Sequence, residues 1–448
     1  MAHVAIVVPG IMGSVLELNG EEVWPGSALE LVLPYNKISK LMNPNLQATD
    51  IIRSFSVSEQ YQRVIDDLGR CGFREDDNPK TLYLCPYDWR KDNALAAQKL
   101  ADLIDQAVTQ NGATEVSLIA HSMGGLVSRY YLESGEFNAR PGYSSVRRLL
   151  TLGTPHRGSP LALSAAMGKE KRLFLNADQV QLLANDSRYP ALYQLMPPRG
   201  EPFAWNEDQK AEFSEVDIYD AGIAKALGLS TDNLTAAQNF HRKLDIAKRP
   251  KVQGKEIRYF FFVGTRQTTI SSVNVFQIGP SQYQVRKTEL EDAGDGTVPI
   301  WSASITGIQG QPVGGEHGTI YKNDTLRRTM AALLGAKGVL AAEIQVEVAL
   351  RERVVHPADT VHLALTFGAV VDKLAGKLAI QRVQVADNGK VGYSKPVSLY
   401  PISYTGLNAE KLGVVFSAPG FPGIYRVAYI PDGYDDPAGT DELIVQQE

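Results

Sequence analysis

The chain has 448 residues, of which 45 are lysine or arginine and 50 are aspartate or glutamate, giving a formal charge of −5 at pH 7. This balance argues against nucleic-acid binding, which needs a clustered basic surplus. Apolar residues make up 44% of the chain and charged residues 21%, a mixture that predicts a folded protein rather than a disordered one.

The N-terminal region predicts a cytoplasmic location. Its apolar run, 4–8, ends at Pro9 and Gly10 and is too short for the apolar stretch of a signal peptide. The chain also has no run of about 18 apolar residues, which a membrane-spanning helix would need. We therefore expect neither a signal peptide nor a transmembrane segment.

Residues 1–335 alternate short apolar runs with helical patterns. The runs are apolar almost throughout, which is typical of strands buried on both faces; they are 4–8, 81–84, 116–120, 149–152 and 257–263. The helical patterns include 61–70, 94–108, 126–133 and 325–334. Strand and helix in alternation predict an α/β fold, with a mostly parallel sheet covered on both faces.

Two segments interrupt this alternation. The first, at about 20–55, is irregular and predicts a small lid. The second, at about 160–255, carries charged helical patches and a cluster of prolines and aromatics, and it is too long for a simple loop. We expect it to form a cap over the sheet.

After residue 340 the pattern changes to strands alone. Seven candidates are separated by Gly, Pro and Asp turns: 344–350, 360–367, 378–385, 397–404, 412–416, 424–430 and 443–445. Their spacing predicts an immunoglobulin-like β-sandwich. We therefore expect two domains, 1–340 and 341–448.

Cys71 and Cys85 are the two cysteines of the chain. One pair cannot form a disulfide framework, and no histidine pattern nearby has the spacing of a zinc site. We expect both to be reduced, with a disulfide as the alternative, and we expect no metal and no cofactor.

Ser122 lies in VSLIAHSMGG, residues 116–125, between an apolar strand and a helix. A sharp strand-to-helix turn exposes a serine hydroxyl above the sheet and directs backbone N–H groups toward a developing oxyanion. Small residues must flank the serine. Ala120 and Gly124 meet this need, although Ala120 replaces the first glycine of GxSxG. We interpret Ser122 as a nucleophile.

A nucleophilic serine needs a base, and the chain offers seven histidines. In an α/β-hydrolase the acid and then the histidine follow the serine. Six histidines fit less well, because they precede or adjoin Ser122 or lie directly after a strand, in the cap or in the C-terminal domain: His3, His121, His156, His241, His356 and His362. His317, in the glycine-rich segment GGEHGTIYKN before a helix, is the predicted base.

Asp295 is the predicted acid. It lies in AGDGTVP, 22 residues before His317, which leaves room for one short strand. Asp292 and Glu291 are adjacent alternatives. An isolated Asp-Gly pair usually only forms a turn, but the position between a candidate nucleophile and a candidate base favours a catalytic carboxylate.

The oxyanion hole is expected to combine two backbone N–H groups. One belongs to Met123, directly after the nucleophile, and the other to Ile11 or Met12 in the loop PGIMGS. This loop matches neither GxGxxG nor GxxxxGK[ST], so nucleotide binding is not favoured.

Six motifs occur in one order along the first 335 residues: PGIMGSVLE, EQYQRVIDDLGRCGF, CPYDWR, HSMGG, LGTPHRGS and GDGTVP. In these motifs the chain resembles the lecithin:cholesterol acyltransferase family, which includes lysosomal phospholipase A2 and phospholipid:diacylglycerol acyltransferases. The resemblance implies Ser122 as nucleophile, Asp295 and His317 as its partners, and Ile11 with Met123 as oxyanion donors.

The resemblance also implies a lid and a cap over an acyl pocket. Candidate substrate contacts are Met12, Trp24, Tyr193 and Trp205, although large aromatics are equally typical of a cap core. Residues 88–90 are expected to hold a loop near the site by ion pairing and packing. The chain departs from the family's secreted and lysosomal members, since it shows no leader and no lid cysteines and adds a β domain.

These observations predict a serine-dependent acyl-ester hydrolase or O-acyltransferase that acts on phospholipid-like esters through an acyl-enzyme. Its partners would be the lipid ester and water or an alcohol acceptor, with a transient membrane-surface contact left open. One alternative is a soluble carboxylesterase for short esters. Another is a non-catalytic binding or scaffold protein that uses the C-terminal sandwich, whose partner the sequence does not identify.

Overall fold

The computed structural model describes residues 2–55, 58–59, 61–208, 214–252, 255–280, 282–336, 346–385, 391–434 and 436–447. At its centre is a six-stranded parallel sheet with the order β16-β13-β9-β8-β1-β7. The strands are β1 (Ala2–Val8), β7 (Leu82–Leu84), β8 (Ala113–His121), β9 (Val146–Leu152), β13 (Arg258–Thr265) and β16 (Gln309–Gly314). The parallel sheet confirms the predicted α/β class, and β16 is the short strand expected between Asp295 and His317.

The register brings the carboxyl ends of the central strands together. Val8 at the end of β1 pairs with Ala120, and His121 at the end of β8 pairs with Leu152. The loops that follow these strands therefore meet at one edge of the sheet. In open α/β sheets this is the edge at which ligands bind.

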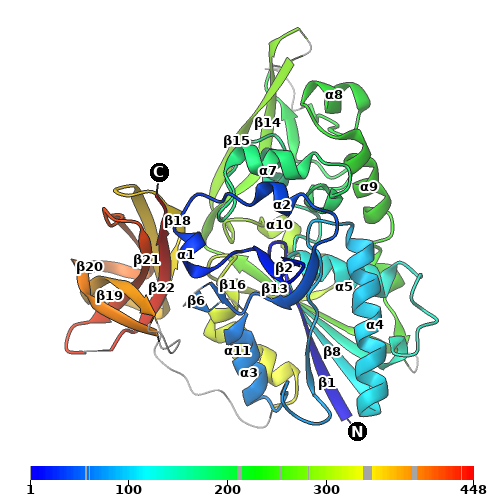
Figure 1. The fold of residues 1–448 in the computed structure, drawn as a ribbon, viewed down its shortest axis with the longest axis horizontal. Helices are drawn as coiled ribbons and strands as arrows, with labels where there is room; N and C mark the ends of the chain where they lie inside the picture. Colours follow the sequence, from blue (N-terminus) through cyan, green and yellow to red (C-terminus); the bar gives the residue numbers. More distant parts are fainter. Residues whose placement is uncertain are drawn as a thin grey trace.

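Helices cover both faces of the sheet, because successive strand residues point to opposite sides. Val4, Ile6 and Val8 belong to a core shared with α4 (Asn93–Asn111) and α5 (Met123–Glu133). Ala5 and Val7 belong to a second core, shared with α3 (Gln62–Arg70) and α11 (Asp324–Leu333). Figure 1 shows the two helix pairs on opposite sides of the strands.

The predicted cap lies between β9 and β13. Its elements are α6 (Pro160–Ala166), α7 (Ala177–Ala184), η2 (Pro190–Leu195), β10 (Ala204–Asn206), α8 (Ala221–Ala226), α9 (Thr231–His241), η3 (Ile246–Lys248), β11 (Lys251–Val252) and β12 (Lys255–Glu256). The cap also includes a hairpin that the sequence analysis missed, formed by β14 (Gln267–Gly279) and β15 (Gln282–Gly294). β14 pairs with β10, so the hairpin joins the cap at the top of Figure 1.

The predicted lid is a compact unit. A three-stranded sheet, β3-β2-β4, is accompanied by two single-turn helices. These elements are β2 (Ser14–Leu18), β3 (Glu21–Trp24), α1 (Ala28–Leu31), α2 (Ile38–Leu41) and β4 (Gln47–Ile51). The short pair β5 (Ser54–Phe55) and β6 (Ser58–Glu59) follows.

The C-terminal region is all-β, as predicted. Its strands are β17 (Val346–Leu350), β18 (Val354–Val355), β19 (Thr360–Val385), β20 (Val391–Ser417), β21 (Gly423–Pro431) and β22 (Gly439–Val445). The strands expected at 360–367 and 378–385 are two halves of β19, and those at 397–404 and 412–416 are parts of β20. The first half of β19 pairs with β17 and the second half with β21.

These strand pairings do not establish an immunoglobulin-like topology, which stays a prediction. The expected boundary at residues 340 and 341 lies outside the described residues, as does the start of the strand expected at 344–350. Cys71 and Cys85 are free, as predicted. Within the described ranges, no helix is both long and apolar enough to cross a membrane.

Candidate active site

Ser122 occupies the sharp turn between β8 and α5. Its backbone has φ 51° and ψ −125°, a conformation that non-glycine residues rarely adopt. The turn is fixed because the Ser122 N–H donates to Leu152 O at 2.9 Å, and Ser122 O accepts the Thr154 hydroxyl at 2.9 Å. Backbone strain of this kind is concentrated at functional sites.

Gly124 shows why small residues follow the serine. A Cβ atom at this position would lie 2.5 Å from Pro9 O and would also overlap Val8 O. The start of α5 therefore packs directly against the backbone at the end of β1. This contact places the loop of residues 9–13 beside Ser122.

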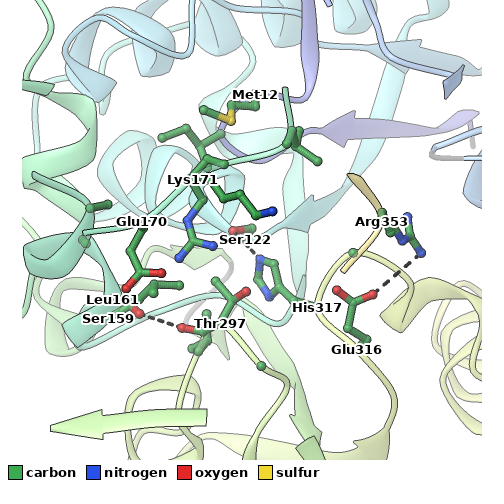
Figure 2. A pocket seen from close by; sticks show the side chains of 18 of the residues that line it. Met12, Ser122, Ser159, Leu161, Glu170, Lys171, Thr297, Glu316, His317 and Arg353 are labelled. Carbon is green, nitrogen blue, oxygen red and sulfur yellow. Dashed lines mark hydrogen bonds and ion pairs between the residues drawn. The ribbon is translucent and has the colours of Figure 1, made fainter. Parts of the chain in front are cut away.

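Ser122, His317 and Asp295 form a continuous chain of hydrogen bonds. His317 Nε2 lies 2.9 Å from Ser122 Oγ, and His317 Nδ1 lies 2.8 Å from Asp295 Oδ2. Since a carboxylate only accepts, Nδ1 carries the proton and Nε2 is free to accept the serine proton. Figure 2 shows the imidazole of His317 directed at Ser122.

Asp295 is fully buried and held from both sides. Its Oδ1 accepts N–H groups from Thr297 at 3.1 Å and Val298 at 2.7 Å, which leaves Oδ2 directed at His317. The alternatives Glu291 and Asp292 are exposed on β15. The geometry therefore selects Asp295 among the three carboxylates.

The pKa of His317 is raised above its ordinary value of 6.5. Burial alone would lower it, but the adjacent Asp295 carboxylate, with help from the nearby Glu316, stabilises the protonated ring more strongly. A histidine that gains a proton during a reaction needs such support.

His121 and Tyr61 support the site without being part of that chain. His121 Nε2 lies 3.0 Å from His317 O, and its Nδ1 lies 2.8 Å from the Tyr61 hydroxyl, which accepts the Gly10 N–H at 2.8 Å. Burial lowers the pKa of His121 to about 3, so the ring stays neutral. The sequence analysis set His121 aside as a base because it adjoins Ser122. It missed this supporting role, because no local pattern shows contacts with residues 60 and 196 positions away.

The predicted oxyanion donors lie on the two segments beside the Ser122 hydroxyl. Met123 is the first residue of α5, so its N–H has no partner inside the helix. Ile11 lines the cavity beside Ser122, and within the described part of the chain its N–H has no recorded acceptor. Met12 also lines the cavity and has a left-handed backbone, with φ 60°.

A cavity of about 690 Å³ extends from Ser122 and His317 beneath the cap. Its apolar wall comes mainly from cap residues, including Leu161, Leu175, Val180, Leu183, Leu192 and Leu195. The volume and the lining suit an apolar chain of an organic ligand.

Two cations line the same cavity at the cap. Lys171 is drawn on the cap side of the cleft in Figure 2, and Arg172 follows it in the chain. Arg172 Nη2 is buried without a hydrogen-bond partner among the described residues, and burial lowers the pKa of this guanidinium. A buried unpaired donor of this kind is costly unless a ligand satisfies it.

Three of the four predicted substrate contacts are corrected by the structure. Trp24, Tyr193 and Trp205 do not line the cavity. Trp24 is fully buried against Trp89 at a ring distance of 5.3 Å, and it donates to Met12 O. Tyr193 is buried in the cap, where it bonds Asn185, and Trp205 lies in β10 beside the hairpin. Of the four predicted substrate contacts, only Met12 lines the cavity.

The expected role of residues 88–90 agrees with the contacts. Arg90 is buried and forms a bidentate pair with Asp88, at 2.8 and 2.6 Å. The same guanidinium donates to the carbonyl groups of Leu41 and Asn43 in the lid. The lid is therefore fastened to the loop after β7.

His156 and His3 make their contacts away from Ser122. His156 is buried, stacks on Phe261 at a ring distance of 3.8 Å, and bonds Thr151. Its pKa is well below the usual value because of burial. His3 bonds Ser117. None of these contacts involves Ser122.

Part of the chain matches a known family model. Residues 45–239 match the family model described as lecithin:cholesterol acyltransferase. Lecithin-cholesterol acyltransferase-like 4 of Arabidopsis thaliana is 22% identical over 410 aligned residues, which cover 72% of this chain and 74% of that protein.

Two further matches are more limited. A triacylglycerol lipase of Pseudarthrobacter phenanthrenivorans is 38% identical over 91 residues, so the match covers 20% of this chain and only 22% of the lipase. A carboxylesterase structure from Nitrososphaera gargenis is 12% identical, covering 75% of this chain and 89% of that chain with a TM-score of 0.30.

Proposed function

Because the chain belongs to the lecithin:cholesterol acyltransferase-like family of α/β-hydrolases, we propose that it is a serine-dependent acyl-ester hydrolase or O-acyltransferase. The observation that carries this proposal is the chain of hydrogen bonds from Ser122 through His317 to Asp295 at the end of a large, mainly apolar cavity. An acyl chain fits the apolar part of that cavity.

The reaction begins when Ser122 Oγ attacks the ester carbonyl carbon and His317 Nε2 takes the hydroxyl proton. The negative charge that develops on the carbonyl oxygen is stabilised by the N–H groups of Met123 and Ile11. Asp295 keeps the Nδ1 proton in place and stabilises the protonated imidazole.

The tetrahedral intermediate then collapses. The carbon–oxygen bond to the alcohol breaks, His317 gives its proton to the departing oxygen, and an acyl-enzyme remains on Ser122. Water or an alcohol next gives its proton to His317 Nε2 and attacks the acyl carbon. This second tetrahedral intermediate collapses when the bond between the acyl carbon and Ser122 Oγ breaks, and His317 returns the proton to Oγ. The products are a fatty acid in the first case and a new ester in the second.

The substrate class is proposed to be phospholipid-like. Lys171 and Arg172 line the cavity that contains Ser122, and the unsatisfied Arg172 donor would be paired by a phosphate oxygen. A neutral triacylglycerol offers no such anionic group. Short soluble esters would leave most of the apolar wall without a partner.

The test is mass spectrometry of lipid products from mixed phospholipid vesicles with an alcohol acceptor, comparing wild type with Ser122→Ala. We expect free fatty acid or acylated acceptor that depends on Ser122, and the ratio of the two identifies hydrolysis or transfer. Triacylglycerol emulsions and short-chain esters serve as comparison substrates. If only short esters are turned over, the substrate class is wrong; if none is turned over, the catalytic proposal fails.

The acid limb of the pH profile of kcat/KM is expected above pH 6.5. The neutral imidazole of His317 is the active form, and its raised pKa keeps the ring protonated, and so inactive, up to higher pH. Asp295→Asn removes the carboxylate that raises this pKa, so the residual activity should show the limb at lower pH. Glu316→Gln should shift it less, because Glu316 contributes less to the raised pKa. An unmoved limb in Asp295→Asn would contradict the assigned pairing.

A further inference from the structure

The C-terminal β domain, residues 346–447, contacts the hydrolase domain at the lid and at the cap hairpin. Gln446 Nε2 donates to Leu31 O and Leu33 O at 3.0 Å each, and the Gln447 N–H donates to Val32 O at 3.0 Å. Arg351 lies 3.4 Å from Glu289 on β15. Figure 1 shows the domain beside α1 and the central part of the molecule.

The β domain also lines the cavity that contains Ser122. Residues from three of its segments belong to the cavity wall, including Arg351, Arg353, His362, Leu363, Ala364 and Lys411. The cap provides most of the apolar wall, whereas this wall combines charged side chains, such as Arg351, Arg353 and Lys411, with apolar ones. The substrate cleft is therefore built by both domains.

A third contact reaches the loop of the predicted base. This loop, residues 315–322, follows β16, contains His317 and ends in the short helix η4 (Ile320–Lys322). Arg353 lies 3.7 Å from Glu316, the residue directly before His317, and 3.0 Å from Asp441 on β22. Figure 2 shows the pair of Arg353 and Glu316 beside the imidazole.

Two more side chains of the β domain contact the same loop. Glu347 Oε1 accepts the Thr319 hydroxyl at 3.5 Å, and a Cβ atom at Gly315 would lie 2.7 Å from that oxygen. Asp441 Oδ1 lies 3.8 Å from Lys322 Nζ. The β domain thus contacts the loop at both ends and next to its histidine.

The opposite side of the loop is held by the hydrolase domain. The His317 N–H donates to Asp295 O at 2.8 Å, and His317 O is bonded by His121 at 3.0 Å. The position of the imidazole therefore depends on two sets of anchors. A loop fixed on only one side would sample more geometries around Ser122, and small displacements of a catalytic group are costly.

We propose that the C-terminal β domain forms part of the active site. Arg353 is the positioning residue: by pairing with Glu316, it connects the β domain to the His317 loop and holds that loop in place. The proposal rests on the catalytic role of His317 under the proposed function. Under this proposal the β domain contributes to catalysis by its own chain.

The charges at this contact support the pairing. Burial raises the pKa of Glu316 to about 7, and Arg353 is the strongest influence that lowers it. Burial likewise raises the pKa of Glu347 to about 8. Removing Arg353 would raise the pKa of Glu316 further, so this carboxyl group would be protonated and would lose its charge.

The test compares Arg353→Met with Arg353→Lys, Glu316→Gln and Arg426→Met in the full chain. Arg426 is the matched control, because it bonds Gln381 inside the β domain. Hydrogen exchange of residues 315–322 is measured by mass spectrometry, with α4 as internal reference. Kinetic constants are measured per fluorophosphonate-titrated Ser122, so that unfolded molecules do not count.

Arg353→Met is expected to raise exchange in residues 315–322 about tenfold without affecting α4, and to lower kcat about tenfold with a smaller change in KM. Arg353→Lys should recover most of kcat, and Arg426→Met should match wild type. Glu316→Gln keeps the Arg353 and Asp441 pair, so it tests the same contact if Arg353→Met folds poorly. The Arg353→Met/Glu316→Gln double variant should be no worse than either single variant.

The proposal is overturned if loop exchange and kcat per titrated site stay at wild-type values in both Arg353→Met and Glu316→Gln. It is also overturned if the two substitutions act multiplicatively, because independent effects exclude a shared contact. If the wild-type chain has no esterase activity, the proposed function fails, and the exchange measurement still decides whether the β domain holds the loop.

Discussion

Ser122→Ala is expected to lower kcat for ester hydrolysis on the order of 10⁵-fold while leaving the fold intact. The hydroxyl is the attacking atom, and no other side chain lies at 2.9 Å from His317 Nε2 among the recorded contacts of the described residues. Removing one oxygen from a largely buried side chain creates little empty space, so the thermal unfolding temperature should change by a few degrees at most.

The measurement is turnover of a chromogenic ester together with fluorophosphonate labelling. Wild type should gain one adduct at Ser122, and the variant should gain none. Ser128→Ala is a matched control on the same helix; its hydroxyl bonds Gly124 O at 2.8 Å and it is outside the cavity wall. Substantial turnover by Ser122→Ala, with loss in Ser128→Ala, would exclude Ser122 as nucleophile.

His317→Ala should be nearly as damaging, with a loss on the order of 10⁴-fold in kcat. Without the imidazole, nothing takes the proton of Ser122, whose hydroxyl is a weak nucleophile at neutral pH. Asp295 would keep its bonds from Thr297 and Val298, so the loops around it should remain folded. Turnover and fluorophosphonate labelling rate are measured together with circular dichroism.

His156→Ala provides the comparison. His156 is buried and stacked on Phe261, so its removal should cost about 2 kcal/mol of unfolding free energy and leave turnover per folded molecule close to wild type. The opposite result, with activity lost in His156→Ala and retained in His317→Ala, would mean that the base has been assigned incorrectly.

Much of the site was accessible from the sequence because its parts have local signatures. Ser122 has a strand, a helix and small neighbours around it, and Asp295 and His317 lie in glycine-rich turns after it in the expected order. These signals depend on short-range backbone requirements, such as the close packing of Gly124 on Pro9. These signals can therefore be identified in the sequence without any knowledge of the fold.

The aromatic residues show the limit of this reasoning. Trp24, Tyr193 and Trp205 were predicted as substrate contacts because the family resemblance implies an acyl pocket beneath the lid and the cap, although large aromatics are equally typical of a cap core. Composition cannot distinguish the two, since both environments exclude water. The packing of Trp24 against Trp89 and of Tyr193 inside the cap assigns these two side chains to cores.

By itself the sequence determined the alternation of strands and helices, the two insertions, the all-β character of the C-terminal region and the identity of the nucleophile, acid and base candidates. Each of these follows from periodicity or from spacing along the chain. Only the tertiary structure decided which groups meet across long separations: His121 with His317, the Arg172 donor with the cavity, and Arg353 with Glu316. These contacts depend on strand register and domain docking, which many side chains set jointly, so no local pattern records them.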